Sequence, residues 1–148
     1  MHIRCIAHIL NLIVQDGLKD VSEAVKKVRE CVRYVRNTPA RLRKFKEFAE
    51  LVGIQSKACL CLDVPTRWNS TYLMLKTACV FEKAFDKFDE QDSSFRSDLK
   101  DSVPDYFDWL SVNKLVDLLK HFYEMTLRVS DSDNVTSNTL FSEISELY

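Results

Sequence analysis

Hydrophobic residues recur at three- and four-residue steps along most of this chain, which is the spacing of amphipathic helices. The clearest run extends over residues 21–35: Val21, Ala24, Val25, Val28, Val32 and Val35. Thr38 and Pro39 then predict an N-cap with proline in the first helical position, and the helix that follows continues to Gly53. A fourth helical pattern runs from about Trp68 to Phe88.

The two ends of the chain differ from this middle part. Residues 1–7 form a short segment with β-branched side chains, which predicts the end of a strand. This strand would lead into an apolar helix that stops at Gly17. Residues 91–102 are polar and acidic and predict a surface connection. A long helix is expected after Pro104, and residues 136–138 can cap a last helix through Leu147.

Composition favours the same fold class. Only 2 glycines and 3 prolines interrupt the 148 residues, and 46% of the residues are hydrophobic, enough for a core. We therefore expect a mainly α chain with at most one or two short strands at the N-terminus. The longest apolar stretch, 6–14, is shorter than the roughly 20 residues that cross a bilayer. We therefore expect no association with a membrane. The five cysteines are an odd number, which favours reduced thiols in an intracellular protein over a disulfide framework.

Charge is distributed unevenly. Residues 26–46 hold nine Lys or Arg against one acid, whereas residues 82–108 hold nine acids against four bases. Four of the bases repeat at steps of three and four and predict one basic stripe on a helix: Lys26, Arg29, Arg33 and Arg36. Such a stripe is either a solvated helix face or a contact for a polyanion, and the sequence leaves both interpretations open.

Cys5 and His8 have a spacing that would let a thiolate and an imidazole meet one metal ion. A tetrahedral zinc site needs four ligands, and the obvious further donors, Cys59 and Cys61, are about fifty residues away. A catalytic Cys-His pair would lack a third group to orient it. Structural packing is the more frequent outcome for such a pair.

The segment from Asp63 to Thr71 has two interpretations. Trp68 can be buried at a helix start, with Arg67 paired to a carboxylate such as Asp63. Alternatively, the indole stacks on an unpaired base while Arg67 neutralises phosphate and Asn69 adds hydrogen bonds. Physical chemistry alone favours the buried indole.

The segments RCIAHILNLIVQDGLK, VRECVRYVRNTPARLRKFKEF and LDVPTRWNSTYLMLKTA occur in this order along the chain. They resemble the hAT superfamily of transposases, and are most similar to the plant BED-type zinc-finger branch with the ricesleeper and daysleeper proteins. The combination of C-x-x-H-x-x-N-L with D-V-x-T-R-W-N-S-T makes the resemblance specific.

The resemblance implies a partial RNase H-like transposase region over residues 1–148. Residues 1–8 would end a core strand, and 9–148 would form a helical insertion that reaches the next RNase H-fold segment near the C-terminus. Cys5 and His8 would lie beside the catalytic centre. Arg67 and Trp68 would approach DNA, with the indole stabilising a flipped base.

The family's three catalytic acids would lie before Cys5 and beyond the insertion, so the chain is expected not to be an enzyme and to have no catalytic residue, metal or cofactor of its own. A divalent metal and a BED-finger zinc are implied for the full-length family alone. We expect a fragment that contributes DNA binding in the nucleus, with a possible homodimer through regions missing here. The alternative is a helical protein-protein interaction module from a decayed transposase gene. The expected DNA-binding residues are Arg67, Trp68, Asn69, Lys26, Arg29, Arg33, Arg36, Arg41 and Arg43.

Overall fold

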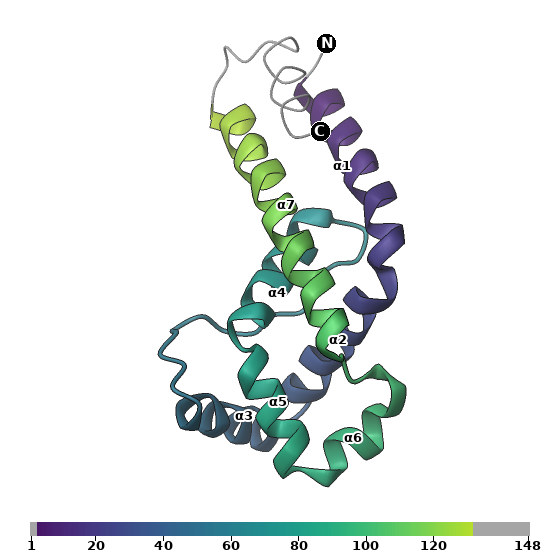
Figure 1. The fold of residues 1–148 in the computed structure, drawn as a ribbon. Coiled ribbons are helices and arrows are strands. Elements are labelled where there is room, and N and C mark those ends of the chain that lie inside the picture. The colour runs from purple at the N-terminus through teal and green to yellow at the C-terminus, as the bar shows by residue number, and fades with distance from the viewer. Residues whose placement is uncertain (1–2, 132–148) are drawn as a thin grey trace.

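A computed structural model describes residues 3–131, and within this range the regular structure is entirely helical (Figure 1). The α-helices are α1 (Ile3–Leu18), α2 (Ser22–Arg36), α3 (Pro39–Leu51), α4 (Trp68–Val80), α5 (Glu82–Gln91), α6 (Ser93–Leu99) and α7 (Tyr106–Asp131). Two 3-10 turns accompany them, η1 (Lys19–Val21) and η2 (Lys100–Ser102). The mainly α prediction is confirmed, whereas the helix predicted over 136–147 lies outside the described residues.

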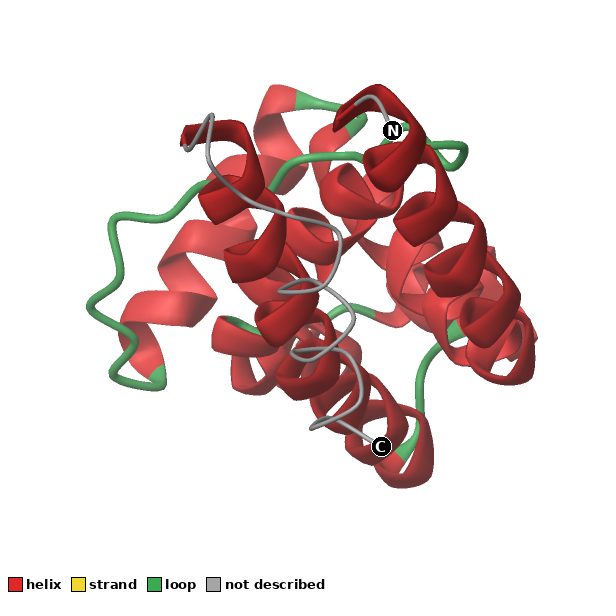
Figure 2. Cartoon of the chain, turned by 90° about the horizontal axis from the view of Figure 1, so that it is seen from above, coloured by secondary structure: helices red, strands yellow, loops and turns green. Residues whose placement is uncertain are grey.

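The helices form two connected groups around α2. Helices α1 and α7 run side by side at one end of the molecule, and α4 packs against α7 (Figure 1). At the other end α3 packs against α5, and α5 packs against α6. Helix α2 contacts α3, α4 and α7 and so joins the two groups. Figure 2 shows the same helices from above, with one long loop extending from them on the left.

The predicted strand end over residues 1–8 is wrong where the structure can test it, because α1 already begins at Ile3. No glycine or proline separates this segment from the apolar run that follows, so one helix continues through both. Contacts between α1 and α7 add tertiary support. Local β-propensity is weak enough for such packing to override it.

The single helix predicted from Trp68 to Phe88 is two helices. Helix α4 ends at Val80, and α5 begins at Glu82. Phe81, between them, leaves helical geometry with φ −100° and ψ 16°. Its ring is buried and lies 5.6 Å from the ring of Phe45. The break changes the direction of the chain, so that α5 packs against α3. A straight continuation of α4 need not make this contact.

The polar connection predicted over residues 91–102 is also wrong, because it contains α6 and η2. Asp92 caps α6 by accepting a hydrogen bond from the Ser94 N–H at 2.9 Å. Phe95 is 1% exposed, and its ring lies 5.1 Å from that of Phe88. One apolar side chain in a polar segment therefore attaches this helix to the core.

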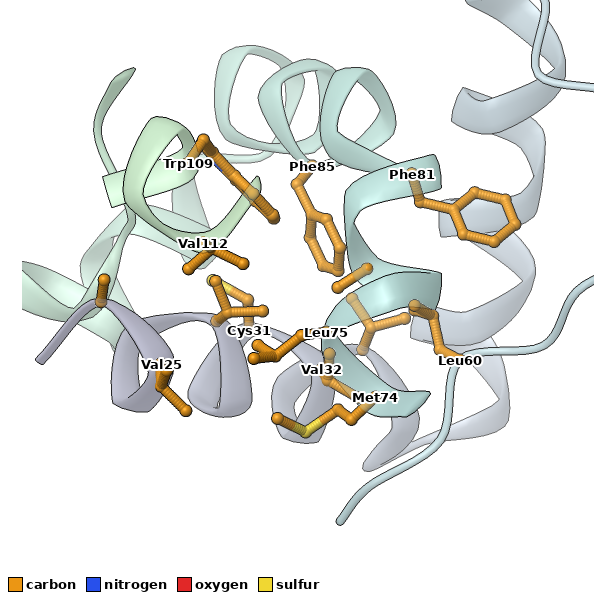
Figure 3. Packing of buried hydrophobic residues seen from close by; sticks show 14 of the residues in the cluster. Val25, Cys31, Val32, Leu60, Met74, Leu75, Phe81, Phe85, Trp109 and Val112 are labelled. Carbon is orange, nitrogen blue, oxygen red and sulfur yellow. The ribbon is translucent and has the colours of Figure 1, made fainter. Parts of the chain in front are cut away.

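The core is continuous through both groups of helices. An aromatic cluster joins α2, α3, α5 and α6, and its members are Tyr34, Phe45, Phe48, Phe85, Phe88 and Phe95. Toward α7 it is continued by Trp109 and Val112, which lie beside Cys31 of α2 and Leu75 of α4 (Figure 3). This core fixes the positions of α2 and α4, from which the candidate site is built.

Because Phe95 attaches α6, we expect Phe95→Ala to lower the free energy of unfolding by about 3–5 kcal/mol through lost apolar burial and the cavity left behind. Urea denaturation measures the change. The matched control is Phe107→Ala, since Phe107 is 71% exposed. Equal stability of the two variants would contradict the anchoring role of Phe95.

Candidate functional site

The side chain of Asp63 is the most enclosed of those that form ion pairs in the described residues, with an exposure of 0%. Arg29 donates two hydrogen bonds to the Asp63 carboxylate, from Nε to Oδ1 at 2.9 Å and from Nη2 to Oδ2 at 2.8 Å. The Thr71 hydroxyl donates a third hydrogen bond to Oδ2 at 2.6 Å. The long 52–67 connection is thereby joined to α2 and to the first turns of α4.

Opposing effects set the pKa of Asp63. Burial by itself would raise the pKa, but the hydrogen bonds from Arg29 and Thr71 and the charge of Arg29 outweigh it and hold the pKa below its ordinary value. The hydrogen bond to Asp63 also raises the pKa of Arg29, despite the opposing effect of burial. Both groups are therefore ionised at neutral pH.

The segment from Val64 to Ser70 forms a turn that is held by hydrogen bonds between its own residues. The Arg67 N–H donates to the Val64 carbonyl at 2.8 Å, and the Ser70 hydroxyl accepts the Val64 N–H at 2.9 Å. The same hydroxyl lies within hydrogen-bonding distance of two carbonyl oxygens, those of Val64 and Arg67. Gln15 of α1 donates to the Pro65 carbonyl at 3.3 Å. Contacts to α1, α2 and α4 thus hold this turn in place.

The turn separates the predicted site residues into inner and outer ones. Trp68 is 4% exposed and belongs to the core. Arg67 and Asn69, on either side of it, are exposed. The pairing of Arg67 with Asp63 is not found, since Asp63 is bound by Arg29. In the described part of the chain the Arg67 side chain has no hydrogen bond or ion pair.

The predicted basic stripe consists of four cations in four different situations. Lys26 is exposed and has no partner among the described residues. Arg29 is bound to Asp63. Arg33 pairs on the surface with Glu30, and Arg36 donates to the Leu60 carbonyl. These side chains share one helix, but Arg29 is largely withdrawn from solvent.

The basic 26–46 region faces the acidic 82–108 region within the same molecule. Three ion pairs cross between them: Lys27 with Asp108 at 3.1 Å, Lys44 with Asp92 at 2.9 Å and Arg41 with Asp98 at 3.6 Å. The Arg41 guanidinium also lies 3.8 Å from the centre of the Tyr34 ring. Much of the basic charge counted in the sequence is therefore neutralised internally. Arg43 and Lys46 remain without an ion pair in the described residues.

Cys5 and His8 lie one turn apart on α1, and His8 is exposed. Cys59 and Cys61 are exposed in the 52–67 connection. Within residues 3–131, no group of three or more His, Cys, Asp or Glu residues is arranged to hold a metal ion. None of the helices in that range is both long and apolar enough to cross a membrane.

Comparison with protein families places this helical unit. The family model described as "ZBED1 RNase-like helical domain" matches residues 3–118, which include α1 to α6 and the Asp63–Thr71 turn. The chain belongs to this family. No solved structure matches it.

Its relatives confirm the resemblance to the ricesleeper-like hAT branch. "Zinc finger BED domain-containing protein RICESLEEPER 2" of Oryza sativa subsp. japonica is 35% identical over 95% of this chain and 19% of the relative. The "Putative AC transposase" of Zea mays is 29% identical over 99% of this chain and 18% of its own length. DAYSLEEPER of Arabidopsis thaliana is 30% identical over 68% of the chain and 14% of its own length.

The chain thus spans about a fifth of the length of the relatives it matches. It is a transposase-derived helical domain. The network of Arg29, Asp63 and Thr71 was missed by sequence reasoning, because Arg29 and Asp63 are 34 residues apart and no pattern relates them. The signal that could have drawn attention to Asp63 was its place inside the most distinctive motif.

We expect Arg29→Met to lower the free energy of unfolding by about 3–5 kcal/mol at pH 7, because it leaves the buried Asp63 carboxylate without its cation. Chemical denaturation measures the loss. The matched control is Arg33→Met, whose arginine is 53% exposed and pairs on the surface, so that it should cost less than about 1 kcal/mol. Similar losses in the two variants would show that the Asp63 pair has no special weight.

The same pair predicts a pH dependence. A folded-state pKa below the unfolded one contributes stability above the unfolded pKa, and this contribution is lost as the pH falls through the folded pKa. Wild type should therefore exceed Asp63→Asn in stability at neutral pH, and the gap should shrink below about pH 3.9. Thermal unfolding across the acid range measures it. Asp16→Asn is the control, because Asp16 is 80% exposed; a gap for Asp63→Asn that stays constant with pH would contradict the prediction.

Proposed function

We propose that this domain contributes DNA binding to a transposase-derived protein. The observation that carries the proposal is Arg67, an exposed cation with no partner in the described residues, on a turn that contacts with three helices hold in place. A guanidinium suits phosphate, because it can donate two parallel hydrogen bonds to the oxygens of the anion. Asn69, exposed next to it, adds a hydrogen-bonding side chain.

Other exposed cations extend this surface in the proposal. Lys26, Arg33 and Arg36 lie on α2, and Arg43 lies on α3. They would neutralise phosphates without reading bases. Arg33 and Arg41 contribute less, since they already pair with Glu30 and Asp98, and Arg41 also stacks on Tyr34. Arg29 and Trp68 act by holding Arg67 in place, and base stacking by Trp68 would require its indole to leave the core.

We propose further that catalysis belongs to other parts of the parent protein. The acids of the family, their divalent metal and the BED-finger zinc would be supplied outside this chain, and Cys5 and His8 would lie beside that catalytic centre. A nuclear location follows from DNA as the partner. A homodimer would form through the other regions.

A helical interaction module is the second candidate, and one surface favours it. Helix α1 exposes three apolar side chains, Ile9 at 42%, Leu12 at 55% and Ile13 at 38%. Exposed apolar surface of this kind marks protein contacts in many soluble proteins. A DNA-indifferent oligomer in sedimentation experiments would favour this candidate over DNA binding.

DNA binding by the chain should depend on salt and on the free cations. We expect the triple variant Lys26→Gln, Arg43→Gln, Arg67→Gln to bind a short duplex more weakly, with the slope of log K against log salt reduced by about 2.7 in magnitude. Fluorescence anisotropy at several salt concentrations measures both. The control removes three other exposed lysines, Lys83, Lys114 and Lys120. A wild-type chain that fails to bind, or a triple variant that binds as the control does, would overturn the proposal.

A further inference from the structure

A groove lies between α3 and the first half of the 52–67 connection. It consists of two adjoining pockets of about 540 and 120 Å³ that share Lys46, Ala58, Cys59 and Phe81. The larger pocket is within the range of roughly 300–1,000 Å³ typical of small-molecule sites. We name it the α3 groove; its main lining residues are Arg36, Lys46, Ile54, Lys57, Ala58 and Phe81.

The wall of the α3 groove that comes from the connection is fixed at both ends. At the start, Gly53 has φ +81°, and the Ile54 N–H donates to the Ala49 carbonyl at 2.9 Å, an arrangement that ends α3 with a left-handed glycine. At the far end Leu60 is 4% exposed, lies among the core side chains and has its carbonyl bound by Arg36 (Figure 3). The groove is therefore formed before any ligand arrives.

The chemistry of the groove is an apolar floor between cations. Phe81, Ala49 and Ile54 line the floor; Ile54 is half-buried, while Phe81 and Ala49 are buried and present only the part of their surface that borders the groove. Lys46 stands on the helix side and Lys57 on the connection side, and both are exposed with no ion pair in the described part of the chain. Arg36 lines the smaller pocket, and Gln55 and Ser56 add polar side chains to the larger one. Glu50 is the one acid in the lining of either pocket.

We propose that the α3 groove binds a nucleotide of an unpaired DNA strand, its base and sugar on the apolar floor and its flanking phosphates at Lys46 and Lys57. This rests on the proposed DNA-binding function and deepens it. Grooves for single strands combine a cationic track with surfaces that accept the flat bases. A duplex keeps its bases stacked on one another, so none of them can lie flat on this floor, although its phosphates can still reach the cations.

Two independent changes test the groove. Lys46→Gln with Lys57→Gln removes its cations, and Ala58→Leu narrows it, without a change of charge or an added aromatic ring, at an exposed position whose backbone N–H already bonds to Ser56. The probes are a fluorescein-labelled oligothymidylate and a duplex of equal length, each titrated at several salt concentrations. Lys114→Gln with Lys120→Gln is the matched charge control, and thermal unfolding confirms that each variant folds.

For the single strand, we expect the Lys46/Lys57 variant to bind on the order of tenfold more weakly near 0.1 M salt, with a salt slope reduced by about 1.4 in magnitude. Ala58→Leu should weaken single-strand binding and leave duplex binding unchanged. Glu50→Gln should strengthen single-strand binding, whereas Glu47→Gln, outside the groove lining, should change it less.

The outcomes separate this proposal from the function on which it rests. If wild type binds DNA with a salt dependence but the groove variants bind the single strand as wild type does, the groove proposal is overturned and DNA binding stands. Equal losses for single strand and duplex in Ala58→Leu would also overturn it. If wild type binds neither probe, the proposed function itself fails.

Discussion

The ion pair between Arg29 and the buried Asp63 is the constraint on which the rest of the candidate site depends. The 52–67 connection contains no α-helix or strand, so a few anchoring side chains determine its course. Asp63 is the charged anchor beside the Arg67 turn. A buried carboxylate is costly unless paired, so two guanidinium hydrogen bonds and one hydroxyl hydrogen bond make this position far more specific than an apolar contact would.

From that anchor the distinctive Asp63–Thr71 segment divides its side chains between two tasks. Asp63, Trp68 and Thr71 are turned to the interior, while Arg67 and Asn69 are exposed. A motif that identifies a family therefore need not consist only of residues that contact a ligand. The inner residues of the motif can hold the outer ones in place. Substitutions at the inner positions would then impair binding by displacing Arg67.

Apolar periodicity predicted where the main helices lie, whereas features that depend on contacts between distant residues were not predicted. The courses of α2, α3 and α7 follow from apolar spacing, which each helix carries within itself. The break at Phe81 and the docking of α6 depend on rings from elsewhere in the chain. Physical chemistry alone favoured a buried Trp68, whereas the resemblance implied a DNA contact there; the partner of Asp63 was not predicted, since Arg29 is 34 residues away.

Charge illustrates the same limit and changes where a polyanion can be expected. Counted along the sequence, the 26–46 region is strongly basic, yet Lys27, Arg41 and Lys44 are paired with acids of the 82–108 region. A phosphate would have to displace those carboxylates to gain these cations, so they add little to its binding. The useful charge comes from cations without an ion pair in the described residues, among them Arg67 on its fixed turn, Lys26 on α2, and Arg43, Lys46 and Lys57 around α3. An interface argued from these residues is smaller than the sequence suggests, and each member can be tested singly.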